Sequence, residues 1–399
     1  MREVVIAKYL RTAQSRSRPS DPSRDWLHPW RADDLLAALL PEVLRRSGVE
    51  SEELDDFIVG SAIGVSEQWT YGGRTPVFLA NLSEKVPAKF VDQQCGSGMA
   101  AVHIGFLEIA AGFADVVLAA GMEHMSRVPM GPTLFDKGVV SLNERLSTEE
   151  AYGHWDMDTT MNMGMTAEKL LSLTSFTRED MDRWSARSHQ RAAKALESGF
   201  LAGEILPLDV EQADGAVLRV ERDQSVRAET TLEALSRLKP VFLEGGAVTA
   251  GNSSPLNAGA SAMVLMSRER AEQKGIEPLA VVRSMGVAGV DPTVMGAGPV
   301  PAVGKALDKA GLTVEEMDFW EINEAFSIVA LNCMRELGIQ EDKVNVMGGA
   351  IALGHPLGAT GIRILGTLAR ILHEKGGRYG CAAACIGGGQ GIATIIERA

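Results

Sequence analysis

Long apolar runs alternate with helical patterns in both halves of the chain. In the first half, a helical pattern over residues 99–112 is followed by an apolar strand pattern over residues 115–121. In the second half, the same order recurs as a helix over residues 362–374 and a strand over residues 380–386. Apolar runs of this kind are typical of strands covered on both faces, as in βαβ units. The pattern therefore predicts an α/β fold, with two core domains of like topology built on parallel sheet.

The stretch from about residue 126 to residue 256 differs in character from the two halves. It is richer in charge and methionine, contains an amphipathic helix pattern over residues 178–199, and ends where glycine and asparagine return in GNSSPLN. We interpret it as an insertion in an N-terminal core domain of residues 1–270, which a C-terminal core domain of residues 271–399 follows. Residues 15–25 (SRSRPSDPSRD) are polar and carry prolines, so we expect a solvated loop there.

Composition narrows the classes of function. The chain has 399 residues, more than one domain usually holds, with 45% hydrophobic and 23% charged residues, as in ordinary globular proteins. Its formal net charge of -13 opposes binding to nucleic acid, so an anionic ligand must meet local basic groups. No apolar run reaches about 18 residues, and the N-terminal residues have the pattern of a strand. We therefore expect a cytoplasmic protein without membrane insertion.

Cys95 is the first candidate for chemistry. It lies in QQCGSGM, where an apolar strand pattern ends, Gly96 and Gly98 flank a turn, and a helix pattern begins. Backbone N–H groups and the positive end of the dipole at a helix start favour a thiolate, and small neighbours let a carbonyl group approach. A free cysteine is also often a small core residue, so Cys95 alone leaves both interpretations open.

The remaining cysteines show no paired spacing with histidines of the kind that holds a metal ion, and we expect no metal site. Cys333 lies in a helical run and Cys381 in a strand-like run, so we expect both to pack in the core.

Three further segments near the C-terminus hold reactive side chains among small residues. They are NEAFS at residues 323–327, GGAIALGHPLGATG at residues 348–361 and CIGGGQG at residues 385–391. Together with Cys95, they supply an amide, an imidazole and a second thiol. Carbon–carbon bond chemistry on thioesters needs an acyl-carrying nucleophile, a base that removes a proton next to a carbonyl, and donors for two oxyanions. The set suits that chemistry.

With these residues, the chain resembles the thiolases, the family of acetyl-CoA acetyltransferases and 3-ketoacyl-CoA thiolases. The blocks follow the family order from VVIAKYLRT to CIGGGQGIATIIE, so the resemblance spans essentially the whole chain. It implies a duplicated αβα layered core with an inserted loop domain that covers coenzyme A. It also implies CoA-dependent cleavage of 3-ketoacyl-CoA to acetyl-CoA and a shortened acyl-CoA, or the reverse Claisen condensation, through an acyl-cysteine in fatty acid metabolism.

The resemblance assigns a role to each catalytic candidate. Cys95 matches the nucleophile that carries the acyl group, and His355 matches the histidine that supports thiolate formation and donates to an oxyanion. Cys385 matches the cysteine that shuttles the proton of the attacking acetyl-CoA carbon. The N–H groups of Gly387 and Cys95 match one oxyanion hole. Asn323 matches the amide that positions a water, which forms the other hole with His355.

The resemblance also implies a set of residues that bind coenzyme A, which would be a substrate rather than a permanently bound cofactor. The set consists of Arg227 against the nucleotide, Ser254 against the pantetheine, Phe326 along the thioester channel, Met163 in a pocket, and Ala325. Asn162 stands where many thiolases have histidine, and PLNAG replaces the more usual GLNDG. These departures leave the acyl-chain preference open.

Two other classes of function compete with a thiolase. A ketoacyl-synthase-like condensing enzyme commonly pairs its cysteine with two histidines, whereas Cys385 occupies the third position here. A non-catalytic partner subunit of thiolase fold would be favoured by loss of a reactive residue, and none is missing. Glu324 is open between a supporting role behind the site and a surface or helix-capping carboxylate. The resemblance further suggests a homodimer or homotetramer.

Overall fold

The computed structural model describes residues 1–136 and 138–399. Its strands are β1 Val4–Thr12, β2 Ser15–Arg16, β3 Asp56–Gly60, β4 Ala88–Val91, β5 Val116–His124, β6 Ile205–Leu206, β7 Leu208–Glu211, β8 Val217–Val220, β9 Asn257–Ser267, β10 Ala280–Gly289, β11 Phe319–Ile322, β12 Tyr379–Ile386 and β13 Gln390–Arg398. Its α-helices are α1 Ala32–Ser47, α2 Arg74–Leu79, α3 Ser97–Ala110, α4 Arg145–Thr148, α5 Met157–Met161, α6 Met163–Ser172, α7 Arg178–Glu197, α8 Leu232–Ser236, α9 Arg268–Lys274, α10 Pro299–Ala310, α11 Ser327–Leu337, α12 Ala350–Leu353 and α13 Leu357–Lys375.

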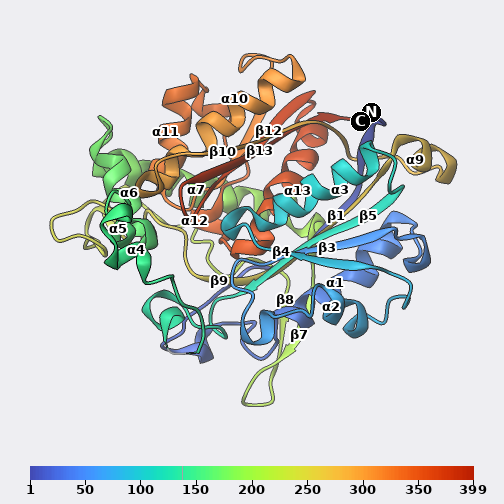
Figure 1. Cartoon of the computed structure of the whole chain (residues 1–399), viewed down its shortest axis with the longest axis horizontal. Coiled ribbons are helices and arrows are strands. Elements are labelled where there is room, and N and C mark those ends of the chain that lie inside the picture. The colour runs from blue at the N-terminus through green and yellow to red at the C-terminus, as the bar shows by residue number, and fades with distance from the viewer. Residues whose placement is uncertain (137) are drawn as a thin grey trace.

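A large mixed sheet runs through the molecule, and its two halves repeat one topology (Figure 1). The main path has the strand order β11-β12-β13-β10-β1-β9-β5-β3-β4. In the N-terminal half, β3 and β5 are parallel, while β9 is antiparallel to both β5 and β1. In the C-terminal half, β11 and β12 are parallel, while β13 is antiparallel to both β12 and β10. The predicted duplication is therefore confirmed.

The expectation of a parallel sheet is correct only for part of it. The strands β3, β4 and β5 are mutually parallel where they pair, as are β11 and β12, but every other pair on the main path is antiparallel. The reason is clearest between β12 and β13, which only three glycines connect. A connection this short cannot cross over the sheet, so the chain must reverse direction.

Three apolar clusters mark the layers around the sheet. One packs α1 against the N-terminal half, and a second packs α10 and α11 against the C-terminal half. The third lies between the halves and contains the apolar side chains of α3 and α13. A Cβ atom on Gly98 or Gly121 would overlap the Gly358 carbonyl oxygen, and one on Gly361 would overlap the backbone nitrogen of Met99. The backbones of α3, β5 and α13 are thus in direct contact.

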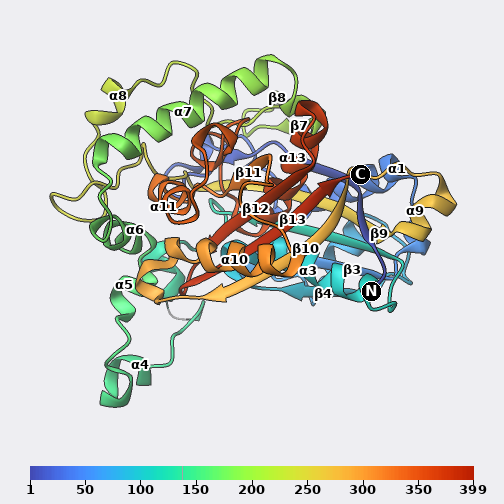
Figure 2. The same ribbon diagram turned by 90° about the horizontal axis from the view of Figure 1, so that it is seen from above.

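Between β5 and β9, residues 126–136 and 138–256 contain helices α4 to α8 and the hairpin of β7 and β8. They also contain the short strand β6, which pairs in parallel with the end of β1 and so rejoins the main sheet. In Figure 2, α4 lies at the tip of an extension that projects from the body, while α7 runs along the opposite side. Among residues 1–136 and 138–399, no helix combines the length and the apolar character needed to cross a bilayer.

The expectation of a solvated loop over residues 15–25 is only partly correct, because residues 19–24 are mostly exposed whereas both ends of the segment are anchored in the body. Ser15, Ser17 and Asp25 are buried, and β2 pairs with the start of β9. The Asp25 carboxylate accepts hydrogen bonds from the hydroxyls of Ser15, of Ser17 at 3.1 Å and of Ser126 at 2.6 Å. One buried carboxylate therefore satisfies three hydroxyl groups and holds the segment against the body.

We expect Asp25→Ala to lower the free energy of unfolding by about 2–4 kcal/mol, because the buried hydroxyls of Ser15 and Ser17 and the half-buried hydroxyl of Ser126 lose their acceptor. Urea unfolding followed by circular dichroism measures the change. Asp21→Ala is the matched control, since Asp21 is exposed and its hydrogen bond is to the nearby Ser23 hydroxyl. Equal unfolding midpoints for the two variants would show that the Asp25 network does not hold this segment.

Candidate active site

Cys95 lies in the turn between β4 and α3. The Ser97 hydroxyl donates to the Gln94 carbonyl oxygen at 2.7 Å and accepts from the Gln93 N–H at 2.9 Å, which closes the turn. Gln94 has a φ of 48°, in the left-handed region that costs a non-glycine residue on the order of 1 kcal/mol. The turn thus holds Cys95 in one defined position at the start of the helix.

Burial, rather than the helix start, dominates the pKa of Cys95. The residue is 7% exposed. This burial raises the pKa of the thiol to about 11, against the lowering effect of the Gly387 N–H, and the charge of Glu123 raises the pKa further. In the free protein, burial therefore outweighs the lowering of the pKa that is expected from a helix start. Cys95 rests as a thiol, with the Gly387 N–H directed at its sulfur, and it needs a base.

His355 is a neutral imidazole held in one tautomer. The Thr360 hydroxyl donates to the Pro356 carbonyl oxygen at 2.8 Å, so its oxygen accepts from the His355 Nδ1–H at 2.7 Å. Nε2 then keeps its lone pair, and Asn323 Nδ2 donates to it at 3.3 Å. Burial and, to a smaller extent, Arg363 lower the pKa of His355 to about 3. The imidazole is therefore neutral near pH 7.

Cys385 lies where β12 ends, ahead of a turn in which Gly388 and Gly389 have φ values of 80° and 75°. Glycine is favoured at such angles because it has no Cβ. Burial raises the pKa of Cys385 well above its ordinary value, and Cys95 is close enough to add to the increase. Cys385 thus rests as a protonated thiol near Cys95. The other two cysteines, Cys333 and Cys381, pack in the apolar cluster around α10 and α11, as their sequence context predicts.

Asn323 follows directly after β11, and its N–H donates to the Ala383 carbonyl oxygen of β12 at 2.9 Å. This bond continues the pairing of β11 with β12 and fixes the backbone of Asn323. Its Oδ1 is buried and has no hydrogen-bond partner among the described residues. A buried amide oxygen of this kind can accept from a water or a substrate group.

Glu324 is buried, so it is a supporting residue behind the site and not a surface or helix-capping carboxylate, the two roles that the sequence left open. Its carboxylate accepts from Trp184 Nε1 at 3.0 Å, the Ser188 hydroxyl at 2.7 Å, Asn345 Nδ2 at 2.8 Å and the Ile351 N–H at 3.1 Å. These donors come from α7, α12 and the loop before it. Glu324 therefore holds the segments around Asn323 together and does not face solvent.

Four of the residues expected to bind coenzyme A lie beside the segment of Asn323 or beside the turn that follows Cys385. The Ser254 N–H donates to the Ala325 carbonyl oxygen at 2.9 Å, and Phe326 follows Ala325 directly. A Cβ atom on Gly387 would lie 3.4 Å from the Met163 sulfur, which places Met163 next to the β12–β13 turn. The fifth residue, Arg227, is exposed on the inserted region.

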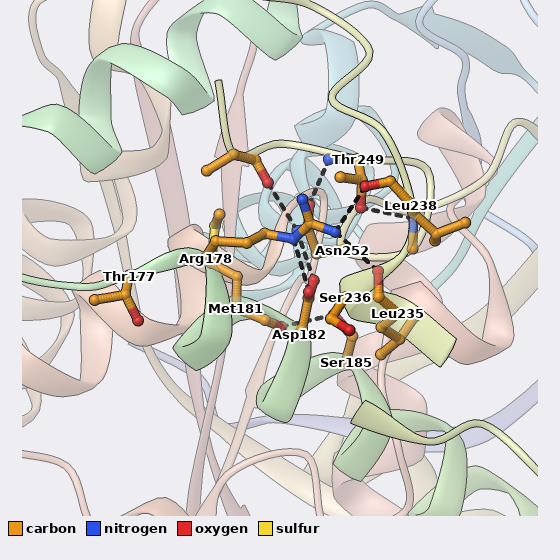
Figure 3. A network of polar contacts seen from close by, with 12 residues as sticks. Thr177, Arg178, Met181, Asp182, Ser185, Leu235, Ser236, Leu238, Thr249 and Asn252 are labelled. Atoms are coloured by element: carbon orange, nitrogen blue, oxygen red, sulfur yellow. Dashed lines mark hydrogen bonds and ion pairs between the residues drawn. The ribbon is translucent and has the colours of Figure 1, made fainter. Parts of the chain in front are cut away.

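The loop that carries Ser254 is held by a buried polar network (Figure 3). Asp182 accepts from Arg178 Nε at 2.7 Å and from Asn252 Nδ2 at 2.9 Å. The Asn252 carbonyl oxygen accepts from the Ser327 N–H at 2.9 Å, which ties the loop to α11. These supporting residues and Thr360 escaped sequence analysis. A usable signal existed only for Thr360, which follows His355 within the first turn of a predicted helix.

Asn162 has a structural task where many thiolases have histidine. Its side-chain oxygen accepts from the Met165 N–H at 3.2 Å and caps the N-terminus of α6.

Within residues 1–136 and 138–399, no cluster of three or more His, Cys, Asp or Glu side chains could hold a metal ion.

Comparison with known families identifies the chain. The family model of the thiolase N-terminal domain matches residues 4–269, and that of the thiolase C-terminal domain matches residues 276–398. The chain belongs to the thiolase family. Its candidate site lies between the two matched regions, since Cys95 comes from the first, and Asn323, His355 and Cys385 come from the second.

Relatives of this thiolase cover its whole length. A 3-ketoacyl-CoA thiolase of Saccharophagus degradans is 43% identical over 100% of this chain and 98% of its own. A 3-ketoacyl-CoA thiolase of Vibrio vulnificus is 42% identical over 100% of both chains. Among solved structures, an acetyl-CoA acetyltransferase of Bacillus anthracis matches with a TM-score of 0.86 at 35% identity, over 100% of this chain and 99% of that one.

We expect Thr360→Val to slow alkylation of Cys95 by iodoacetamide by about 3- to 10-fold, because the His355 Nδ1–H loses its acceptor and Nε2 is no longer held as the base. The pH profile of alkylation should change shape as well, which a purely structural loss would not cause. Thr360→Ser keeps the hydroxyl and serves as the matched control. An unchanged profile in the valine variant would rule out the tautomer assignment.

We expect the rate of Cys95 alkylation in the free protein to rise continuously between pH 7 and pH 10. The thiolate is the reacting form, and a pKa of about 11 keeps it the minor form over this range. Peptide mapping after timed quenching measures the rate at Cys95, with Cys95→Ser as the background. A plateau below pH 8 would mean that the thiol is more acidic than its burial implies.

Proposed function

We propose that this thiolase catalyses the CoA-dependent thiolytic cleavage of 3-ketoacyl-CoA to acetyl-CoA and a shortened acyl-CoA, or the reverse Claisen condensation, through an acyl group on Cys95. The observation that carries the proposal is the arrangement of the candidate groups: Cys95 lies beside Cys385 and the Gly387 N–H, and the start of α3 next to Cys95 contacts the start of α13 next to the neutral imidazole of His355. The names of the relatives, 3-ketoacyl-CoA thiolase and acetyl-CoA acetyltransferase, support the same reaction.

The first half of the reaction makes the acyl-enzyme. His355 Nε2 accepts the proton of Cys95, and the sulfur attacks the 3-keto carbon of the substrate. The Gly387 and Cys95 N–H groups stabilise the oxyanion that forms, as such donors do in acyl transfer. The bond between carbons 2 and 3 then breaks, its electron pair stays on the acetyl-CoA carbon as an enolate, and Cys385 supplies the proton that completes acetyl-CoA.

The second half releases the shortened acyl group. The Cys385 thiolate takes the proton of an incoming coenzyme A thiol, whose sulfur attacks the thioester on Cys95. The departing Cys95 thiolate recovers its proton from His355, so the protein returns to its starting state. Asn323 contributes by orienting a water that, with His355, stabilises the enolate oxygen. Each proton that leaves one group is thereby taken up by another.

Coenzyme A is a substrate in this scheme. Ser254, Ala325, Phe326 and Met163 line its reactive end, and residues 126–256 cover it as a loop domain, with Arg227 at the nucleotide end. The division into core domains of residues 1–270 and 271–399 belongs to the same proposal. We also propose a homodimer or homotetramer, a cytoplasmic location and a role in fatty acid metabolism.

The two competing functions make different predictions for the purified chain. A ketoacyl-synthase-like enzyme is disfavoured because Cys385, a thiol, occupies the third catalytic position. A non-catalytic partner subunit would bind without turnover. Thiolysis of acetoacetyl-CoA by this chain alone, extended to a panel of 3-ketoacyl-CoA substrates, tests the proposed class. The absence of any turnover would favour the partner subunit.

We expect Cys385→Ala to abolish exchange of the acetyl-CoA methyl protons with solvent, while Cys95 still gains the acetyl group in a single turnover. Acylation from a simple acyl-CoA requires no proton removal from carbon, whereas exchange does. Intact mass spectrometry measures the first step and NMR the second. Cys381→Ala, which removes a buried thiol from the same strand, is the matched control. Exchange at the wild-type rate in Cys385→Ala would exclude its role as proton shuttle.

A further inference from the structure

Four arginines gather where residues 15–25 meet the inserted region. We call Arg16, Arg18, Arg24 and Arg227 the arginine cluster. Arg16 and Arg18 are half-buried, while Arg24 and Arg227 are exposed. The charges of Arg227, Arg18 and Arg24 all act on Arg16. The cluster is notable because the whole chain carries a formal net charge of -13.

The strand geometry of this segment sets the direction of its arginines. Ser15 and Ser17 both donate to Asp25, so their side chains lie on the buried face. Successive side chains of an extended chain point to opposite faces. Arg16 and Arg18 therefore share the other face, and the Asp25 network fixes them there.

Gln224 joins this segment to the one that carries Arg227. Its Oε1 accepts from the Arg16 N–H at 2.8 Å, and its Nε2 donates to the Arg24 carbonyl oxygen at 2.7 Å. The neighbouring Asp223 is itself anchored by the buried Arg11, whose guanidinium donates to it at 2.6 Å. Arg227 follows three residues after Gln224, and its N–H donates to His189 Nδ1 at 3.3 Å, so hydrogen bonds position the backbone on both sides of the cluster.

The charges of the cluster are largely uncompensated. In the part of the chain that the structure describes, no carboxylate lies within 4.0 Å of the guanidinium of Arg16, Arg18 or Arg227, and Arg24 has only a marginal pair with Asp21 at 4.0 Å. Burial, followed by the three neighbouring arginines, lowers the pKa of Arg16 to about 10. Repulsion among fixed cations is relieved by a bound anion.

The cluster is also linked to the catalytic loop through one side chain. Asn257 Nδ2 donates to the Ser15 carbonyl oxygen at 2.7 Å, and its Oδ1 accepts from the His355 N–H at 2.7 Å. Asn257 pairs with Arg16 across β2 and β9. The strand end that carries the arginines therefore lies beside the segment that carries His355.

We propose that Arg16 and Arg18, together with Arg227, bind the phosphate groups at the nucleotide end of coenzyme A. This proposal rests on the proposed function for the identity of the ligand. Guanidinium groups match phosphate oxygens with paired N–H donors, and residues 15–25 supply them on a fixed face. The buried Ser225 hydroxyl, which has no partner among the described residues, lies in the same segment as Arg227. Residues 15–25 thus add to the binding of coenzyme A and are more than a surface loop.

Steady-state thiolysis of acetoacetyl-CoA with coenzyme A, dephospho-coenzyme A or pantetheine as acyl acceptor tests the proposal. We expect Arg16→Gln with Arg18→Gln to raise the ratio of KM for coenzyme A to KM for pantetheine by about tenfold, because pantetheine has no phosphate to lose. Arg16→Lys should recover part of the effect. Arg45→Gln removes the same charge from the exposed end of α1 and should leave the ratio unchanged. An unaltered ratio in the double variant would overturn the proposal.

Calorimetric titration with adenosine 3′,5′-bisphosphate tests the site without turnover. We expect the wild-type protein to bind it and the double variant to bind it at least about fivefold more weakly, with a weaker salt dependence. Equal affinities would overturn the proposal whatever the enzyme activity. Binding that depends on Arg16 and Arg18 in a protein that shows no thiolysis would instead keep the anion site and refute the proposed function.

Discussion

The direct backbone contact among α3, β5 and α13 is the constraint on which the site depends. Gly98, Gly121, Gly358 and Gly361 lie so close to the neighbouring backbone that none has room for a Cβ atom. Because α3 begins just after Cys95, and α13 begins just after His355, this contact brings the two reactive side chains to one end of the middle layer. Both halves of the sheet pack against this middle layer, so the turn that carries Cys385 lies at the same end of the layer, beside Cys95.

Burial sets the chemistry of the groups brought together in this way. It raises the pKa of Cys95 to about 11 and lowers that of His355 to about 3, so the pair rests neutral as thiol and imidazole. A proton transfer between them costs free energy until a substrate oxyanion and its donors compensate for the charges. We infer that the free protein keeps its nucleophile unreactive and activates it when the substrate is bound.

Irregular loops carry most of the site, and buried polar side chains keep them rigid. Glu324, Asp182 and Asp25 each accept hydrogen bonds from segments far apart in the sequence. A buried acceptor with all its donors in place favours one arrangement strongly, because any other leaves a polar group unsatisfied. The same principle fixes the face of β2 that carries Arg16 and the loop that carries Ser254.

By itself, the sequence determined the duplicated α/β organisation and the family, and it singled out four candidate side chains, because periodicity and short motifs are local properties. It did not determine strand direction, the burial of Ser15, Ser17 and Asp25, the tautomer of His355 or the sign of the pKa shift of Cys95. Each of these depends on a partner distant in the chain, as between Ser126 and Asp25, which are 101 positions apart. The helix start at Cys95 is a local feature that favours the thiolate, but the burial that outweighs it involves both halves, since Ile386 and Ile392 lie against the neighbouring Gly96. Only the tertiary structure could decide which of these two effects sets the pKa of Cys95. Desolvation depends on everything packed around a group and not only on its neighbours in sequence.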